Sequence, residues 1–378
     1  MPRLLISCGE PSGEFYGAEL VAELRKEHPD LEAFGLGGDR LASENVRLLA
    51  HLEDLAVVGL VEVLSHLRRL KRLFDSVVAE AARRRPDVAV LIDYPDFNLR
   101  LARELKKLGI PVVYYVSPQL WAWRRGRIKD VKRDVAKMLV IFPFEEAIYR
   151  EAEVPVAFVG HPLIDHVKPP EDRAAFARKL GLSGDRSVLA LLPGSRNKEV
   201  GFNLPPIVGA VKLLRERRPE LQFVIAAAPH LRANALEEAV AAGITVMEGV
   251  TRDVLSSARV TIVASGTATV ETALTLTPMV VVYRLSALTY ALGKPLVSVA
   301  NYAMVNLIAG RLVVPELIQG DFTPARVCEE TLRVLDDGAP RALMLKNLEE
   351  VREKLGKGGA TRHAAEEVSV FLRGVGRG

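Results

Sequence analysis

Two strand-to-helix turns in the second half of the chain carry residues that could bind a phosphate group. Each turn follows an apolar run and contains small residues, so it should expose backbone N–H groups at the start of a helix. Arg196 adds a forked donor that matches phosphate oxygens, and Glu271 lies where a carboxylate could accept hydrogen bonds from a ribose. The pattern predicts a nucleotide-diphosphate site, and two ordinary turns of an α/β sheet are the alternative. The residues assigned to this site are Gly194, Ser195, Arg196, Ser265, Gly266, Thr267 and Glu271.

Two carboxylates, Asp93 and Asp96, follow a strand predicted over Val88–Ile92. Asp96 is expected to be the N-cap residue of the next helix, a position that Asp favours. Asp93 has no such structural task. A carboxylate at the edge of a cleft, near a second carboxylate, is a candidate general base, and a solvated loop residue is the alternative for Asp93.

Two other strand ends carry residues of interest. Gly9, Gly13 and Gly17 permit a tight turn, but their spacing is not the dinucleotide fingerprint, so NAD is not expected. His161 follows a later strand, where a substrate hydrogen bond and a structural turn are both open. Because no cluster of residues has metal-ligand spacing, we expect no metal site.

Two segments combine basic and apolar residues. Trp121 and Trp123 precede the stretch 124–137, which holds seven basic and two acidic residues. It could stack on sugars or bases or lie at a membrane interface, and a solvated helix face is the alternative. The stretch 60–74 has a basic face next to an apolar stripe, which suits an anionic lipid surface or, alternatively, a core-facing helix. The apolar stripe consists of Leu60, Val63, Leu64, Leu67, Leu70 and Phe74, and the basic face of Arg68, Arg69, Lys71 and Arg72.

Bulk composition narrows the class of protein. The chain has 378 residues, 49% of them hydrophobic and 26% charged, which is typical of a soluble globular protein with two domains. A net charge of +4 is too small for nucleic acid binding over the whole surface, so no nucleic acid partner is expected. Neither a signal peptide nor a membrane span is predicted, and two distant cysteines, Cys8 and Cys328, suit a reduced cytoplasmic protein.

Short apolar runs alternate with helical patterns from end to end, which predicts parallel sheets covered on both faces. The predicted strands are Leu4–Cys8, Ala33–Leu36, Val88–Ile92, Val112–Val116, Met138–Phe142, Ala157–Val159, Val188–Leu192, Gln222–Ala226, Thr245–Met247, Val260–Val263 and Met279–Tyr283. The segment His166–Asp172, with two prolines beside charges, is the predicted linker. The expected fold is α/β, with two tandem Rossmann-like, doubly wound domains facing a central cleft. The expected divisions are 1–168, 169–345 and a C-terminal helix within 346–378 that packs back on the first domain.

Several of these stretches together resemble the lipid-A-disaccharide synthase family, whose members are two-domain glycosyltransferases of GT-B architecture. The resemblance is collinear over about residues 1–320 and is most specific around Trp121–Arg124. The matching stretches are Gly9–Gly13 with Gly17–Ala18, Val58–Leu64, Asp93–Asn98, Tyr115–Arg124, Phe142–Glu145, Val159–Pro162, Leu191–Arg196 with Glu199–Val200, Ala264–Ala268, Asn306–Arg311 and Val314–Glu316.

The resemblance implies an inverting transfer of 2,3-diacylglucosamine from its UDP derivative to 2,3-diacylglucosamine 1-phosphate, which gives a β-1,6 disaccharide and UDP. Asp93 would be the base, the second domain would bind UDP, and no cofactor or metal would be needed. The amphipathic helix would hold a cytoplasmic protein on the anionic inner face of the membrane. A homodimer stays open. The substrate-binding residues implied are Glu10, Ser12, Gly13, Asp96, Asn98, Gln119, Trp121, His161 and Asn306.

The chain departs from the family pattern at Glu14, where Asp is usual, and at Val305, where Pro is usual. Both positions adjoin the expected site, so acyl-chain preference or acceptor geometry could differ. Three alternatives stay open: a UDP-GlcNAc epimerase-like enzyme, a glycosyltransferase for another glycolipid acceptor, and an RNA-binding protein using 124–137.

Overall fold

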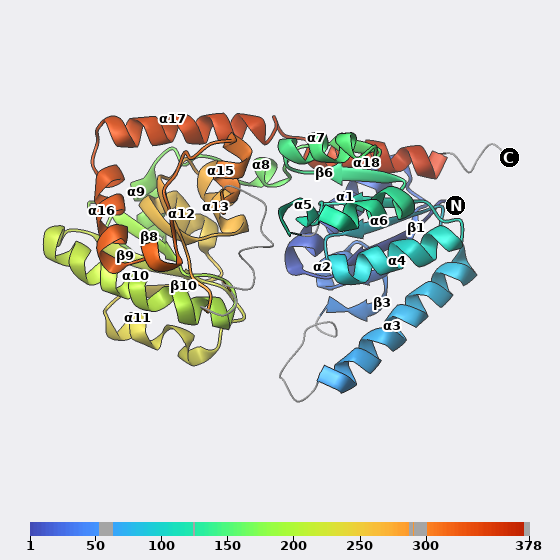
Figure 1. Ribbon diagram of the computed structural model, residues 1–378, viewed down its shortest axis with the longest axis horizontal. Helices are drawn as coiled ribbons and strands as arrows, with labels where there is room; N and C mark the ends of the chain where they lie inside the picture. The colour runs from blue at the N-terminus through green and yellow to red at the C-terminus, as the bar shows by residue number, and fades with distance from the viewer. Residues whose placement is uncertain (53–62, 124, 287–289, 291–300, 374–378) are drawn as a thin grey trace. The chain divides into compact units, whose positions relative to one another are not determined.

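The structure is a computed structural model that describes residues 1–52, 63–123, 125–286, 290 and 301–373 (Figure 1). It divides into two compact units, Met1–Pro162 with Gly356–Gly378, and Leu163–Leu355. The divisions lie at 162 and 355, where the sequence analysis placed them at 168 and 345. Helix α8 (Leu163–His166) belongs with the second unit because it packs on α13, and α17 (Ala339–Lys354) does so because it packs on α13, α15 and α16.

The first unit is built on a seven-stranded parallel sheet with the order β3-β2-β1-β4-β5-β6-β7. The central strands are continuous apolar runs, and Val88–Ile92 is fully buried, as expected for strands covered on both faces. The strands are β1 (Arg3–Cys8), β2 (Glu32–Gly37), β3 (Arg47–His51), β4 (Val88–Ile92), β5 (Val112–Tyr115), β6 (Lys137–Val140) and β7 (Val156–Phe158).

Helices cover this sheet, and the last of them comes from the C-terminal end of the chain. α18 (Ala360–Arg373) packs against α1, where Arg373 forms an ion pair with Glu27 at 2.6 Å and Ser369 lies 3.2 Å from His28 (Figure 1). The other helices are α1 (Pro11–Glu27), α2 (Asp39–Ser43), α3 (Val63–Arg84), α4 (Pro95–Lys107), α5 (Leu120–Trp123), η2 (Arg125–Arg127), α6 (Ile128–Asp134) and α7 (Pro143–Glu151).

The second unit repeats the plan with a six-stranded parallel sheet in the order β10-β9-β8-β11-β12-β13. Its strands are β8 (Val188–Leu192), β9 (Gln222–Ala227), β10 (Thr245–Glu248), β11 (Ala258–Ala264), β12 (Met279–Tyr283) and β13 (Glu316–Ile318). Its other helices are α9 (Arg173–Lys179), α10 (Asn197–Arg217), η3 (Ala233–Leu236), α11 (Glu237–Ala241), α12 (Thr251–Ser257), α13 (Thr267–Leu274), α15 (Met304–Ala309), η5 (Gln319–Asp321) and α16 (Pro324–Leu335).

In both sheets the strand order reverses beside the first strand of the unit. The reversal lies between β1 and β4 in the first sheet and between β8 and β11 in the second. Ligands of open α/β sheets bind beyond the carboxyl ends of the strands at such a point. The prediction of two doubly wound α/β domains is thus confirmed. No helix among the described residues is both long and apolar enough to span a bilayer.

Candidate active site

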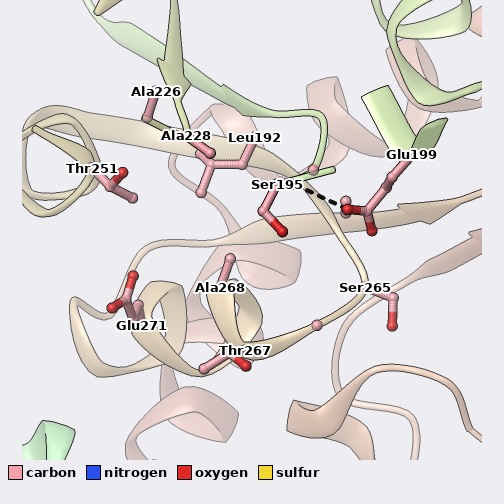
Figure 2. Close-up of a pocket in the computed structure, with 13 residues that line it drawn as sticks. Leu192, Ser195, Glu199, Ala226, Ala228, Thr251, Ser265, Thr267, Ala268 and Glu271 are labelled. Carbon is pink, nitrogen blue, oxygen red and sulfur yellow. Dashed lines mark hydrogen bonds between the residues drawn. The ribbon is translucent and has the colours of Figure 1, made fainter. Parts of the chain in front are cut away.

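A cavity of about 280 Å³ lies at the strand-order reversal of the second sheet (Figure 2). It is bounded by the turns after β8 and β11 and by residues after β9. Of the residues predicted to bind a nucleotide, all but Arg196 line it. The lining residues are Leu192, Gly194, Ser195, Glu199, Ala226, Ala228, Thr251, Ala264, Ser265, Gly266, Thr267, Ala268 and Glu271.

The turn after β8 is shaped to present a backbone N–H to an anionic oxygen. Gly194 has φ +133°, and a Cβ there would lie 2.5 Å from the Glu199 carboxyl carbon. The N–H of Ser195 donates to Oε2 of Glu199 at 2.9 Å, the contact drawn in Figure 2. The backbone donor of this turn is therefore oriented toward an anionic acceptor, which in this structure is the Glu199 carboxylate.

The turn after β11 leads directly into a helix. Gly266, with φ +155°, is the N-cap residue of α13 and provides no side-chain cap. The hydroxyl of Ser265 donates to the carbonyl of Tyr302 at 2.9 Å, which links the turn to the segment before α15. The start of α13 therefore faces the cavity with its backbone donors and the positive end of its dipole.

Glu271 and Arg196 lie at different depths in this region. Glu271, one turn inside α13, is half-buried, and burial raises the pKa of its carboxyl, with Arg252 opposing the shift. Arg196 is exposed at the N-cap position of α10 and does not line the cavity. Its charge opposes the rise in the pKa of Tyr283, which burial and then Glu199 cause.

Seven of the lining residues were not predicted to bind the nucleotide: Leu192, Ala264 and Ala268 belong to the two predicted turns, and the other four are Glu199, Ala226, Ala228 and Thr251. Glu199 follows the β8 turn by one helical turn, and Ala226 and Ala228 lie at the end of β9. Thr251 begins α12. The position of β9 beside β8 in the sheet is the signal that could have indicated Ala226 and Ala228, because neighbouring strand ends share one edge.

In the first unit, Asp93 occupies the equivalent position at the end of β4. Asp93 and Tyr94 both have left-handed backbone conformations, with φ +46° and +52°. Such conformations cost about 1–3 kcal/mol each in non-glycine residues and persist where the surrounding structure enforces them. Here the hydroxyl of Tyr114 and Nδ2 of Asn98 donate to the Asp93 carbonyl at 2.6 Å and 2.9 Å. The half-buried Asp93 side chain is therefore placed by a rigid, strained turn.

Asp96 is not the N-cap residue of α4, which corrects the prediction. Tyr94 is the N-cap residue, because Pro95 takes the first helical position. Asp96 lies in the first turn, exposed, where its carboxylate forms an ion pair with Arg127 at 2.8 Å. An acidic residue there still favours the helix through its dipole.

Asn98 has a structural role in this fold, because its buried side chain presents no surface to a substrate. It is fully buried, and its Oδ1 accepts from the hydroxyl of Ser7 at 2.7 Å. Its Nδ2 also reaches the carbonyls of Ser7 and Ile92, at 3.3 Å and 3.2 Å. Asn98 thus ties the ends of β1 and β4 together beneath Asp93.

The turn after β1 lies against the Asp93 turn. A Cβ on Gly9 would lie 2.1 Å from Cγ of Tyr94, so only glycine permits this approach. Glu10 and Ser12 are exposed, whereas Gly13 is buried against Ile92. The structure therefore brings the predicted residues of the β1 and β4 turns to one edge of the first sheet.

Three further predicted substrate residues lie elsewhere. Asn306 is fully buried and bonds the backbone of Val313 and Val314 and the Glu316 carboxylate, so its polar atoms are engaged inside the second unit. Gln119 is exposed just before α5. The side chain of Trp121 lies outside the described residues.

His161 is buried in the first unit, with only 1% of its surface exposed. Its ring lies edge-on to Tyr16 at 6.4 Å and tilted to Phe142 at 5.3 Å. Burial lowers the pKa of His161 to about 3, so the imidazole is neutral at physiological pH. Such a ring can take part in hydrogen bonds but does not serve as the charged partner of a phosphate.

We expect His161 to make the first unit acid-sensitive. Because its folded pKa lies below the unfolded value of about 6.5, the unfolded state binds the proton first, and stability falls as pH drops through 6.5. Between pH 6.5 and 5 the loss should approach about 2 kcal/mol. Urea unfolding followed by the fluorescence of Trp121 and Trp123 measures it, since both tryptophans lie in this unit. The His161→Gln variant should show a smaller pH slope, and an unchanged slope would contradict this origin.

The predicted membrane helix is only partly exposed. Leu60 lies outside the described residues, as do the side chains of Val63, Leu64 and Leu67. Leu70 and Phe74 pack against the hydrophobic core of the first unit, where Phe74 meets Phe97 edge-on at 5.4 Å. These two residues therefore do not form a free membrane-facing stripe, because the same helical face covers the sheet. The basic residues Arg68, Arg69, Lys71 and Arg72 are exposed.

Both departures from the family pattern are buried. Glu14 accepts from the backbone N–H groups of Arg40 and Leu41, at 2.9 Å and 3.4 Å, and so caps the short helix α2. A Cβ on Gly38 would lie 2.8 Å from its carboxylate, which shows how closely the loop and Glu14 pack. Val305 is a core residue of α15.

The chain matches the family model described as lipid-A-disaccharide synthetase over residues 4–368. Among curated proteins it is 48% identical to the lipid-A-disaccharide synthase of Myxococcus xanthus over 374 residues, which are 98% of each chain. It is also 48% identical to that of Koribacter versatilis, covering 98% of this chain and 97% of that one.

Solved structures match the fold at low sequence identity. A UDP-GlcNAc 2-epimerase from Neisseria meningitidis bound to UDP-GlcNAc superimposes with a TM-score of 0.68 at 12% identity, covering 98% of this chain and 100% of that one. Acinetobacter baumannii MurG gives a TM-score of 0.60 at 14% identity, covering 97% and 99%. At such identities these matches show the fold alone. The predicted GT-B architecture is confirmed.

Proposed function

This chain belongs to the lipid-A-disaccharide synthetase family and is a hexosyltransferase of lipid A biosynthesis, and from that premise we propose how its residues carry out the transfer. The second unit binds the UDP portion of the acylated sugar donor in the cavity between the β8 and β11 turns. Asp93 of the first unit is the general base. The observation that carries the proposal is the strand-order reversal in each unit, because residues predicted to act on the substrates follow the strands beside both reversals.

The donor cavity suits a nucleoside diphosphate without a metal ion. The Ser195 N–H would bind a phosphate oxygen once the Glu199 carboxylate moves away from it, and the start of α13 also lines the cavity. Arg196, at the mouth of the β8 turn, would neutralise diphosphate charge, and Glu271 would accept from ribose hydroxyls. These donors stabilise the negative charge that grows on UDP as the sugar–phosphate bond breaks.

A titration with two probes tests this site. UDP should bind the wild-type protein at least about tenfold more tightly than uridine, because only UDP reaches charged and backbone donors worth more than about 1.4 kcal/mol together. Isothermal titration calorimetry gives both affinities. Equal affinities would contradict the placement of the diphosphate at the two turns.

Asp93 would act on the acceptor. Its carboxylate takes the proton of the acceptor's 6-hydroxyl while that oxygen attacks the donor's anomeric carbon from the face opposite UDP. The sugar–oxygen bond to UDP breaks as the new bond forms, and the anomeric configuration inverts. The strained turn supports this role, because Tyr114 and Asn98 hold the Asp93 backbone from which the carboxylate projects.

We also propose that the protein attaches peripherally to an anionic membrane. The proposal rests on the exposed basic residues of α3, because Leu70 and Phe74 of the apolar stripe pack against the core. Arg68, Arg69, Lys71 and Arg72 form one exposed basic run on α3, beside the half-buried Leu70. Each basic residue near an anionic surface contributes about 1 kcal/mol. The acyl chains of the proposed substrates would keep those substrates in the membrane, so attachment would bring the protein to them.

Neutralising two of these residues should release the protein from anionic vesicles. The Arg68→Gln/Arg72→Gln variant should bind phosphatidylglycerol vesicles roughly 30-fold more weakly, since about 2 kcal/mol of attraction is lost. Sedimentation with vesicles at low salt measures this. Arg333→Gln/Lys346→Gln, which alters two exposed bases of the second unit, is the matched control. Equal binding by both variants, or no binding by the wild type, would contradict membrane attachment through α3.

The epimerase alternative is not favoured. The relatives at 48% identity are named lipid-A-disaccharide synthases, whereas the likeness to the epimerase is 12% and concerns the fold. The RNA-binding alternative has no support from these relatives.

A further inference from the structure

A half-buried guanidinium, that of Arg173, lies at the far ends of two helices that line the donor cavity. Arg173 is the first residue of α9, directly after the predicted linker. Its Nη1 donates to the carbonyl of Ala258 at 2.8 Å and to those of Leu255 and Ser256 at 3.3 Å and 3.4 Å. These carbonyls belong to the last turn and C-cap of α12.

The same guanidinium also caps the second helix. Its Nη2 donates to the carbonyls of Thr275 and Leu276 at 3.0 Å each, at the end of α13. Nη1 further reaches Oγ1 of Thr277 at 3.1 Å, and Thr277 in turn bonds Thr275 and the Leu255 carbonyl. Thr275 and Thr277 are fully buried. The planar guanidinium of Arg173 and these two hydroxyls thus form one hydrogen-bond network that joins the two helix ends.

The opposite ends of these helices are the ones that face the donor. Thr251 begins α12 and Thr267 begins α13, and both line the cavity (Figure 2). Both helices are short, at seven and eight residues, so their direction depends on what holds their ends. A shift at the carbonyl ends would therefore move the N–H groups that line the cavity.

The charge of Arg173 is matched to this position. Backbone carbonyls at a helix C-terminus carry partial negative charge, which a cation complements. In the described part of the chain no carboxylate forms an ion pair with Arg173, so carbonyls and hydroxyls provide its contacts. Burial, together with Arg341 and Arg259, lowers the pKa of Arg173 to about 10, which leaves it charged at neutral pH.

We propose that Arg173 is a positioning residue for the donor cavity: it clamps the C-terminal ends of α12 and α13, and so holds Thr251 and the N-terminus of α13 in place for the UDP group. The inference rests on the proposed function of that cavity. It also links α9 to the donor cavity, because Arg173 is the first residue of α9 and α9 packs against α12.

Arg173→Met tests the clamp, because Met fills similar space without donating a hydrogen bond. We expect UDP to bind this variant between roughly tenfold and a hundredfold more weakly, and KM for the sugar donor to rise more than kcat falls. Arg173→Lys, which keeps the charge but not the fork, should recover part of the UDP affinity. Calorimetry with UDP and steady-state kinetics provide the two readouts.

Arg341→Met is the matched control. Arg341 is another arginine of the second unit, buried where Arg173 is half-buried, and it donates to the carbonyls of Arg259 and Val334, which belong to the ends of neither α12 nor α13. Both Met variants should unfold at lower temperature, but only the Arg173 variants should lose UDP affinity while folded. UDP affinity within twofold of wild type in folded Arg173→Met, or an equal loss in Arg341→Met, would overturn the proposal.

Hydrogen exchange on the wild-type protein tests the clamp without a substitution. UDP should slow amide exchange at the end of α13 around Thr275 and Leu276 as well as at its start, because the helix responds as one held unit. Protection confined to the first turns would overturn the clamp. If UDP does not bind the wild type at all, the donor site itself is wrong, which is a separate failure.

Discussion

Replacing Asp93 with Asn is expected to lower kcat by roughly two to four orders of magnitude, the range for losing a general base. The amide has nearly the same shape as the carboxylate but cannot accept the acceptor's proton. The strained turn should survive, because Tyr114 and Asn98 hold it through the main-chain carbonyl of Asp93. Affinity for UDP should be unchanged, since the proposed donor cavity lies in the other unit.

Asp96→Asn is the matched control, because it removes an equal charge three residues away. Asp96 is exposed and paired with Arg127, so its variant should keep turnover within a few-fold of wild type. Initial rates of UDP release under saturating substrates compare the two. Near-normal turnover in Asp93→Asn would contradict its role and leave Asp96 and His161 as candidates for the base. His161 is buried and its imidazole is neutral at physiological pH.

Replacing Arg196 with Ala should weaken UDP binding by roughly ten- to a hundredfold, the effect of losing a charge-assisted hydrogen bond worth about 1.5–3 kcal/mol. Arg196 is exposed at the start of α10 and does not line the cavity, so its side chain must approach the diphosphate when UDP binds. Calorimetric titration with UDP measures the change, and uridine affinity should stay the same.

The control for this variant is Arg333→Ala, an exposed arginine of α16 in the same unit whose ion-pair partner is Glu330 at 3.6 Å. It should leave UDP affinity at the wild-type value. Equal UDP affinity in the two alanine variants would show that Arg196 does not contact UDP. The backbone N–H groups of the two turns would then be the hydrogen-bond donors to the diphosphate.

Much of the fold follows from simple patterns. Val88–Ile92, Val188–Leu192 and Met279–Tyr283 have the bounds that their apolar runs predict, because buried parallel strands consist of little else. Among the described strands, the two that were missed are Arg47–His51 and Glu316–Ile318, which are edge strands with apolar runs of only three and two residues. Helix α10 begins at Asn197, so prolines 205 and 206 lie inside the helix.

The site was less predictable where a residue type fits both a ligand and a fold. Asn98 and Asn306 have the chemistry of substrate contacts, yet both are fully buried and satisfy backbone groups. Leu70 and Phe74 have the spacing of a membrane stripe, yet that spacing also suits packing on the sheet. Arg173 could not be selected from sequence, because its partners are carbonyls that only the fold brings together.

The most direct test of the account is UDP release by wild-type protein from UDP-2,3-diacylglucosamine, with and without 2,3-diacylglucosamine 1-phosphate, followed by analysis of the sugar product. A hexosyltransferase with Asp93 as base should release UDP only when the acceptor is present and should form one β-1,6 disaccharide 1-phosphate for each UDP. UDP release that ignores the acceptor, or conversion of the donor to another UDP-sugar without a disaccharide, would contradict it.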